Sequence, residues 1–199
     1  MSHLPQRIAS LQPSATLVVA ELGALHRLVA CTKYCADVCP AVGESKAAII
    51  HDSWTADAAQ ILATRPDLVL ASVPYQEKAL AEILKAGIPV LALAPHSLRD
   101  VYADMALIAG VVGEAERGER LIERMQGEIS EISKKAAQAG TRPRVFCEEW
   151  GKPIIVSQPW VAELACFAGG EFLGSPGKQI TAEEACAAAP EVIVAAWCG

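Results

Sequence analysis

Large aromatic side chains with a polar edge recur in or beside the loops that follow segments with the pattern of buried strands. They are Tyr34, Trp54, Tyr75, Trp150 and Trp197. Only 5% of the 199 residues are aromatic, so this concentration is unusual. A flat aromatic face stacks on a planar, partly apolar ligand, while its polar edge bonds to the rim. We therefore predict contacts with a flat macrocycle; the alternative is that these rings fill the edges of the fold.

Other side chains with chemical potential share these loops. Pro13 follows the first predicted strand and begins a helix. Glu148 and Glu149 either bind a cation or a ligand amide, or simply form a polar loop. His51 and His96 are candidate metal ligands, although a lone loop histidine more often bonds to water or backbone. We include Pro13 and Glu149 among the expected ligand contacts.

The cysteines favour a rival site. Cys35, Cys147 and Cys198 all lie at or just past predicted strand ends. Thiolates that converge can bind a soft metal ion or an iron–sulfur cluster. The three-residue spacers between Cys31, Cys35 and Cys39 do not match a zinc ribbon, which needs shorter ones. The alternative function is therefore a cytoplasmic thiolate site for a metal or cluster.

Three other cysteines are expected to be structural. Cys31 ends a predicted strand and should point into the core, and Cys166 and Cys186 lie on apolar helix faces, where a thiol behaves as a small apolar group. Seven cysteines make an odd number, which is a poor disulfide framework. Free thiols are easier to maintain in a reducing compartment.

Strand and helix patterns alternate along most of the chain. Short apolar runs that are buried on both faces predict parallel strands. They lie at 7–11, 28–31, 68–71, 88–93, 144–147, 154–156 and 192–196. Residues 32–40 are expected to form a loop. The pattern predicts an α/β fold with doubly wound parallel sheets.

Residues 97–138 interrupt this alternation with apolar residues at helical spacing. Gly113 should divide them into two helices, the second of which spans roughly 37 Å at about 1.5 Å per residue. We predict a long backbone helix that joins two lobes across a ligand-binding gap; the alternative is a helix packed on one domain. The predicted regions are 1–96, 97–139 and 140–199, with the last lobe incomplete.

Composition excludes several classes of function. The net charge of −6 and the absence of a basic patch argue against nucleic-acid binding. No apolar run is long enough to span a membrane. The first residues lack a signal-peptide pattern, so we expect a cytoplasmic protein, or a periplasmic or cell-surface one whose signal was removed. No phosphate loop or nucleophile elbow is present, so we expect no enzyme.

Three stretches are similar to those of one protein family: Arg65–Leu70 (RPDLVL), Arg142–Phe146 (RPRVF) and Ala189–Val194 (APEVIV). With the order of elements and the long helix, they make residues 7–199 resemble the helical-backbone class of ABC-importer substrate-binding proteins, and within it the vitamin B12-binding proteins. The resemblance implies a corrinoid such as cobalamin in an interlobe cleft, delivered to a permease or held by a cytoplasmic relative of such proteins. Iron-siderophore and haem binders share the fold and are alternatives.

The resemblance also implies roles for single residues. Tyr34 and Trp54 match aromatic residues that lie against the corrin, and Glu183 matches a glutamate that docks on the permease. Two positions depart from the family pattern. The docking glutamate of the first lobe falls at Ala59, and the aromatic wall of the second lobe falls near Gly177. A third reading is therefore an interaction module that kept the fold but lost the transporter.

Overall fold

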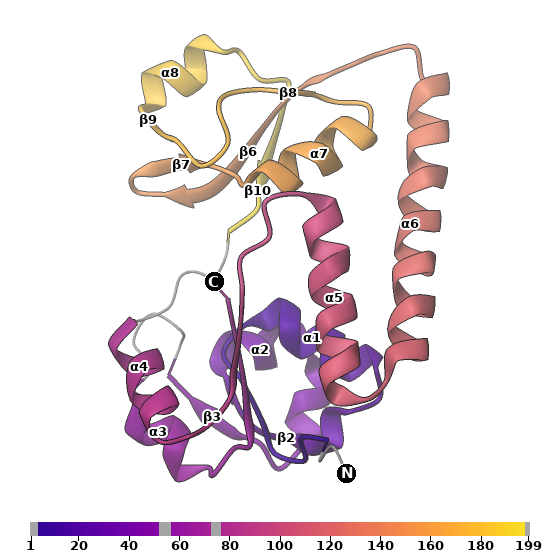
Figure 1. The fold of residues 1–199 in the computed structure, drawn as a ribbon. Coiled ribbons are helices and arrows are strands. Elements are labelled where there is room, and N and C mark those ends of the chain that lie inside the picture. The colour runs from indigo at the N-terminus through magenta and orange to yellow at the C-terminus, as the bar shows by residue number, and fades with distance from the viewer. Residues whose placement is uncertain (1–3, 52–56, 73–76, 198–199) are drawn as a thin grey trace. The chain divides into compact units, whose positions relative to one another are not determined.

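The computed structural model describes residues 4–51, 57–72 and 77–197, and both of its compact units combine sheet and helix (Figure 1). Unit one comprises Met1–Ala94 and Ala103–Leu121, and unit two comprises Pro95–Tyr102 and Ile122–Gly199. The connecting helices are thus divided between the two units. The predicted regions 1–96, 97–139 and 140–199 stay a prediction. The expected α/β class is confirmed.

Unit one contains a five-stranded, fully parallel sheet with the order β3-β2-β1-β4-β5. Its strands are β1 (Ile8–Ser10), β2 (Leu28–Thr32), β3 (Ala48–Ile50), β4 (Leu68–Ser72) and β5 (Val90–Leu93). Four were predicted. The fifth, β3, was missed because it is a three-residue edge strand with Ala48 and Ile49 exposed, so it lacks a buried apolar run.

Successive residues of this sheet enter two separate cores, as the period of two requires. On β4, Leu68 and Leu70 join a core with helices α1, α2 and α5, whereas Val69 and Ala71 join a second core with α3 and α4. Helices therefore cover both faces of the sheet. The helices are α1 (Pro13–Glu21), α2 (Lys33–Val38), α3 (Ala58–Ala63), α4 (Glu77–Lys85) and α5 (Leu98–Val112).

The predicted break in the helical stretch is confirmed. Gly113 has a positive φ of 82° between α5 and α6 (Ala115–Gln138). A Cβ atom there would also lie 2.5 Å from the side chain of Leu4, so glycine meets both a backbone and a packing requirement. The 24 residues of α6 correspond to about 36 Å at 1.5 Å per residue.

Two arginines fix this helical corner within unit one. Arg27 donates through Nη1 to the carbonyl oxygen of Val112 at 2.8 Å, and Arg117 donates through Nη1 to that of Leu22 at 2.7 Å. Glu114 lies between them, 3.9 Å from Arg27 Nη2 and 3.6 Å from Arg117 Nε. The guanidinium groups thereby satisfy carbonyl groups at the ends of α5 and α1, which have no partner within their helices.

Most of the predicted loop at residues 32–40 is helical: α2 occupies Lys33–Val38, and after Cys39 the 3₁₀ helix η2 (Pro40–Glu44) begins. Thr32 is the N-cap of α2, and its hydroxyl accepts from the backbone N–H of Cys35 at 3.3 Å. The helix directs Cys35 into the first core, and Cys39, just beyond its end, also packs there. Burial of these side chains stabilises the helical turn. Sequence spacing alone did not reveal this burial.

The thiols of β2 and α2 form a buried cluster with hydroxyl groups. Cys35 Sγ lies 3.1 Å from Thr32 Oγ1 and 3.8 Å from the carbonyl oxygen of Ser10. A hydrogen bond with Cys31 and others with Thr16 and Thr32 lower the pKa of the Cys35 thiol to about 6, against the effect of burial. The bond with Cys35 and burial raise the pKa of Cys31. One thiol of the pair therefore holds its proton strongly.

Unit two has a mixed sheet with the order β10-β6-β7-β9, in which β8 also pairs with β6. The β6–β7 and β7–β9 pairs are antiparallel, which differs from the parallel sheet expected for this lobe. Its strands are β6 (Arg144–Gly151), β7 (Ile154–Val156), β8 (Glu171–Phe172), β9 (Gln179–Ile180) and β10 (Val192–Ala195).

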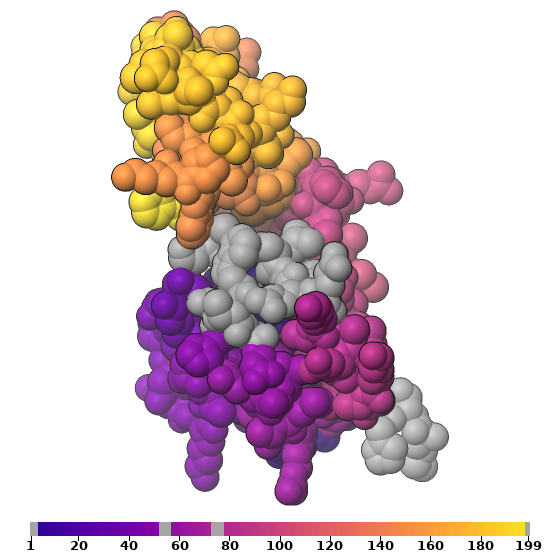
Figure 2. Space-filling view, turned by 90° about the vertical axis from the view of Figure 1, so that its left-hand side faces the viewer, coloured from indigo at the N-terminus to yellow at the C-terminus, as the bar shows by residue number. Residues whose placement is uncertain are grey.

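The C-terminal part of unit two is unusually exposed. Neither α7 (Pro159–Phe167) nor α8 (Ala182–Ala187) buries a residue, and every residue of β10 is exposed, Ile193 by 67%. The yellow segment that contains α8 lies at the surface in the space-filling view (Figure 2). Cys166 and Cys186 are exposed, so their prediction as core thiols was wrong, because no described element fully covers their helix faces.

We predict that Thr32→Val destabilises the protein by about 1–2 kcal/mol, because the isosteric valine removes the cap from α2 and leaves the Cys35 N–H without its partner. Urea unfolding followed by circular dichroism measures the change. Thr141→Val, at an exposed position, is the control and should change the free energy of unfolding by less than about 0.5 kcal/mol. Equal values for both variants would contradict the capping role.

We also predict two classes of thiol. In a Cys198→Ser background, Cys166 and Cys186 should react rapidly with Ellman's reagent. The buried Cys31, Cys35, Cys39 and Cys147 should react only after denaturation, because access limits reaction even where a lowered pKa favours it. Absorbance at 412 nm counts the thiols released. A third fast thiol in the native protein would argue against the burial of these four thiols.

Candidate functional site

The carboxyl end of β2 presents an aromatic and a cationic side chain together. Lys33 and Tyr34 form the first turn of α2, directly after the Thr32 cap. Lys33 is exposed and Tyr34 is half-buried. The ammonium nitrogen of Lys33 lies 4.6 Å from the centroid of the Tyr34 ring, within the range of a cation–π interaction. Tyr34 therefore keeps part of its ring accessible while the neighbouring charge is held against it.

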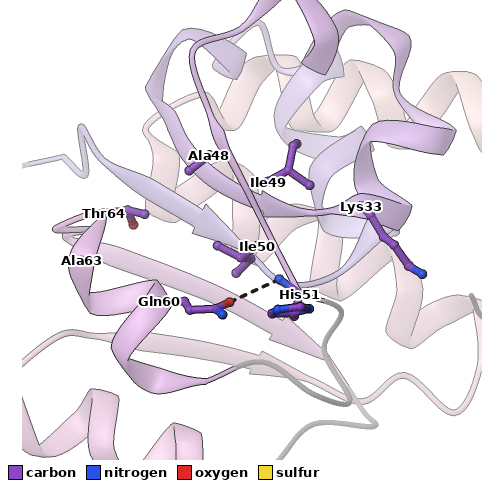
Figure 3. Close-up of a pocket in the computed structure, with 8 residues that line it drawn as sticks. All are labelled: Lys33, Ala48, Ile49, Ile50, His51, Gln60, Ala63 and Thr64. Carbon is purple, nitrogen blue, oxygen red and sulfur yellow. Dashed lines mark hydrogen bonds between the residues drawn. The ribbon is translucent and has the colours of Figure 1, made fainter.

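A surface pocket of about 600 Å³ adjoins this turn (Figure 3). Strand β3 and helix α3 line it, and the backbone N–H of His51, just past β3, donates to Gln60 Oε1 at 3.4 Å. Lys33 lines it from the neighbouring strand end. The full lining is Lys33, Ala48, Ile49, Ile50, His51, Gln60, Ala63 and Thr64. Parallel α/β sheets bind ligands beyond the carboxyl ends of their strands, and Lys33 and His51 occupy such positions.

At the carboxyl end of β1, two hydroxyl groups form a small hydrogen-bond network. Thr16 Oγ1 lies 2.8 Å from Ser10 Oγ, which donates to the carbonyl oxygen of Gln12 at 3.2 Å. Both hydroxyl-bearing residues are buried. Pro13, a predicted ligand contact, is half-buried at the first position of α1. Its ring presets the helical φ, which gives it a structural role independent of any ligand.

Two predicted tryptophans lie in unit two, and both are partly exposed. Trp150, at the end of β6, is 39% exposed, and Trp197, after β10, is 58% exposed. Trp197 Nε1 donates to Glu148 Oε1 at 2.9 Å, and Trp150 Nε1 donates to the Lys152 carbonyl oxygen at 3.2 Å. Strands β6 and β10 pair in parallel, which brings their carboxyl ends together and accounts for the Trp197–Glu148 contact.

Glu149 and Glu183 have different environments. Glu149 Oε2 accepts from Gln158 Nε2 at 2.7 Å, so its carboxylate orients the residue that precedes α7. Glu183 is exposed in the first turn of α8, where its own backbone N–H and the Thr181 side chain lower the pKa of its carboxyl. Its charge is therefore available at the surface. Glu183 as a docking residue and Glu149 as a ligand contact stay predictions.

Asp57, the described acidic residue beside the expected docking position Ala59, caps a helix. Asp57 is the N-cap of α3, and its Oδ1 accepts from the backbone N–H of Ala59 at 3.0 Å. The family pattern places a docking glutamate at Ala59, and the neighbouring carboxylate serves the helix end instead. Among the described residues, Asp57 is thus engaged at the end of its own helix and does not replace the missing glutamate.

The predicted thiolate site gains no support. Cys35 and Cys147 are buried in the cores of their own units, and Cys198 lies outside the described residues. Within the described ranges, no three side chains of His, Cys, Asp or Glu gather in a way that can hold a metal ion. Trp54 and Tyr75 also lie outside the described residues, so their predicted ligand contacts stay predictions.

Sequence reasoning missed the pocket beside β3. Gln60 and Thr64, on the side of α3 that faces β3, received no role, because the pocket depends on an edge strand that was not predicted. The available signal was Lys33, a charged residue directly after a buried strand.

The helices that the structure describes include none long and apolar enough to cross a membrane.

Comparison with known proteins shows which proteins this chain is similar to in sequence and in structure. A vitamin B12-binding protein of Pectobacterium atrosepticum is 28% identical over 96% of this chain and 71% of its own length. Among solved structures, the haem-binding protein of a Roseiflexus species is 25% identical with a TM-score of 0.81, over 94% of this chain and 75% of its own. The vitamin B12-binding protein of Vibrio cholerae is 22% identical with a TM-score of 0.76, over 96% and 76%.

The match to the family described as "Periplasmic binding protein" runs from residue 8 to residue 199. It includes all ten strands of the described residues. The sequence resemblance to substrate-binding proteins is thereby confirmed. The chain belongs to the periplasmic binding protein family, as a substrate-binding protein of the ABC-importer type.

Proposed function

We propose that this protein binds a corrinoid such as cobalamin, as the substrate-binding component of an ABC importer. The observation that carries the proposal is Tyr34. It is half-buried in the first turn after β2, at the position where the resemblance to vitamin B12-binding proteins expects an aromatic wall. The 28% identity with a vitamin B12-binding protein across 96% of the chain supports the same ligand.

Tyr34 has the properties that a stacking wall requires. The Thr32 cap and the buried Cys35 fix the turn on either side of it, so the backbone that carries the ring is positioned before a ligand arrives. Such preorganisation lowers the entropy cost of binding. An aromatic face against a partly apolar macrocycle adds about 0.5–1.5 kcal/mol beyond the area that it buries.

Haem is the second candidate ligand. The specific observation in its favour is the TM-score of 0.81 with a haem-binding protein, against 0.76 with a vitamin B12-binding protein. A half-exposed tyrosine ring such as that of Tyr34 suits a porphyrin as well as a corrin, because both are flat and largely apolar. A metal ion held by Cys35, Cys147 and Cys198 is not retained, since the first two thiols are buried.

We further propose that the protein acts in the periplasm or at the cell surface and delivers its ligand to a permease. The family description supports this location. Glu183 supports the partner, because its exposed carboxylate in the first turn of α8 is available for an arginine of another protein. Charged rim contacts of this kind steer association more than they add affinity.

The ligand is tested by titrating the protein with cyanocobalamin and, separately, with hemin while tryptophan fluorescence is followed. We expect quenching with a dissociation constant in the micromolar range or below, about −8 kcal/mol or stronger, for one of them. Tyr34→Ala should weaken that ligand roughly tenfold through the lost stacking and contact area. Tyr34→Phe, which keeps the ring, should retain most of the affinity.

Tyr102→Ala is the matched control, because Tyr102 is, like Tyr34, a half-buried tyrosine on a helix, but it belongs to unit two. It should leave the dissociation constant unchanged once circular dichroism shows a folded protein. Absence of quenching by either ligand up to roughly 100 µM, where an affinity weaker than about −5.5 kcal/mol would be implied, would refute the proposed function.

A further inference from the structure

The described lining of the pocket in unit one offers hydrogen-bond donors to a ligand but no anionic group. Lys33, His51, Gln60 and Thr64 supply its polar side chains. None of its described lining residues is an aspartate or a glutamate. The remaining lining consists of alanine and isoleucine side chains from β3 and α3. A pocket of this composition suits a ligand with an apolar body and an acidic or strongly accepting group at its rim.

Lys33 is the charged residue at one end of this pocket (Figure 3). Its backbone is fixed by the Thr32 cap, and its ammonium lies 4.6 Å from the centroid of the Tyr34 ring. Among the described residues it forms no ion pair, including with Asp37 one helical turn later. An ammonium carries three N–H donors, and a contact with an aromatic face leaves donors directed elsewhere.

The charge of Lys33 lies close to the ring of Tyr34, the proposed stacking residue. The ammonium lies over one face of the Tyr34 ring. A macrocycle that stacks on the other face therefore brings its rim within reach of the flexible lysine side chain. His51 and Gln60 line the same pocket from β3 and α3. A charge-assisted hydrogen bond from an ammonium to a carboxylate or phosphate is about twice as strong as a neutral one.

We propose that Lys33 recognises a peripheral anionic group of the ligand, a carboxylate or a phosphodiester, while Tyr34 holds the ring. This inference rests on the proposed function and deepens it, because it restricts the ligand to macrocycles with an acidic group at the rim. Corrinoids with a nucleotide loop carry a phosphodiester, and haem carries two propionates. In this arrangement the protein reads the rim of the macrocycle separately from its metal centre.

The test compares ligands that differ in the anionic group. Hemin is paired with hemin dimethyl ester in one dilute detergent buffer, and cyanocobalamin is paired with dicyanocobinamide, which lacks the phosphodiester. Each is titrated into the wild-type protein and into Lys33→Gln, which keeps most of the stem and removes the charge. For the ligand that binds, we expect the variant to lose about tenfold in affinity toward the acidic form and less than about twofold toward its partner.

Lys85→Gln is the matched control, because Lys85 is an exposed lysine at the end of α4 that does not line the pocket. It should bind all four compounds as the wild type does. Lys33→Glu should weaken the acidic ligand further than Lys33→Gln, and added salt should reduce the difference between them. Circular dichroism and thermal unfolding establish that each variant is folded.

The outcomes separate the two proposals. If the wild type binds a macrocycle but Lys33→Gln binds it equally well, this inference is overturned and the proposed function stands. If Lys33→Gln weakens the acidic and esterified or truncated forms to the same extent, Lys33 merely supports the Tyr34 ring, and the inference is again overturned. If the wild type binds none of the four compounds, the proposed function and this inference fall together.

Discussion

The parallel sheet of unit one, buried on both faces, is the constraint on which the described site depends. Successive residues of β4 enter two separate cores, with Leu70 on one face and Val69 on the other. Apolar side chains occupy both faces, so the polar groups that can meet a ligand gather where the strands end. Lys33 follows β2 in this way and His51 follows β3. The chemistry at this edge is a consequence of helix packing on both sides of the sheet.

Burial also decides which reactive groups are available. Cys35 and Lys33 belong to the same short helix, yet the thiol turns into the core and the ammonium remains at the surface. The hydrogen bonds that lower the pKa of Cys35 to about 6 come from Cys31 and from hydroxyl groups of the same core. The lowered pKa of Cys35 therefore arises from contacts within the core. Lys33 and Tyr34 form the part of this turn that can meet a ligand, which supports a role in stacking and charge recognition.

Unit two also combines a five-stranded sheet with helices, but its sheet is mixed and fewer of its residues are buried. Val145, Phe146 and Cys147 of β6 are buried, whereas every residue of the adjacent β10 is exposed. A sheet buries only the faces that other elements cover, so apolar patterning in 192–195 and on α7 predicted the elements without predicting their burial. This is why the core assignments for Cys166 and Cys186 were wrong, while the helices that carry them were predicted correctly.

The sequence by itself determined the alternation of strands and helices, the break at Gly113 and the long helix α6, because these depend on local periodicity and on one backbone conformation. It also placed Tyr34 at a strand end, and the resemblance drawn from its motifs gave the family. Only the tertiary structure decided that Thr32 caps a helix, that Cys35 faces inward, and that β3 and α3 enclose a pocket with Lys33. These features depend on contacts between segments that lie apart in the chain, and spacing along the sequence does not specify the direction in which a side chain points.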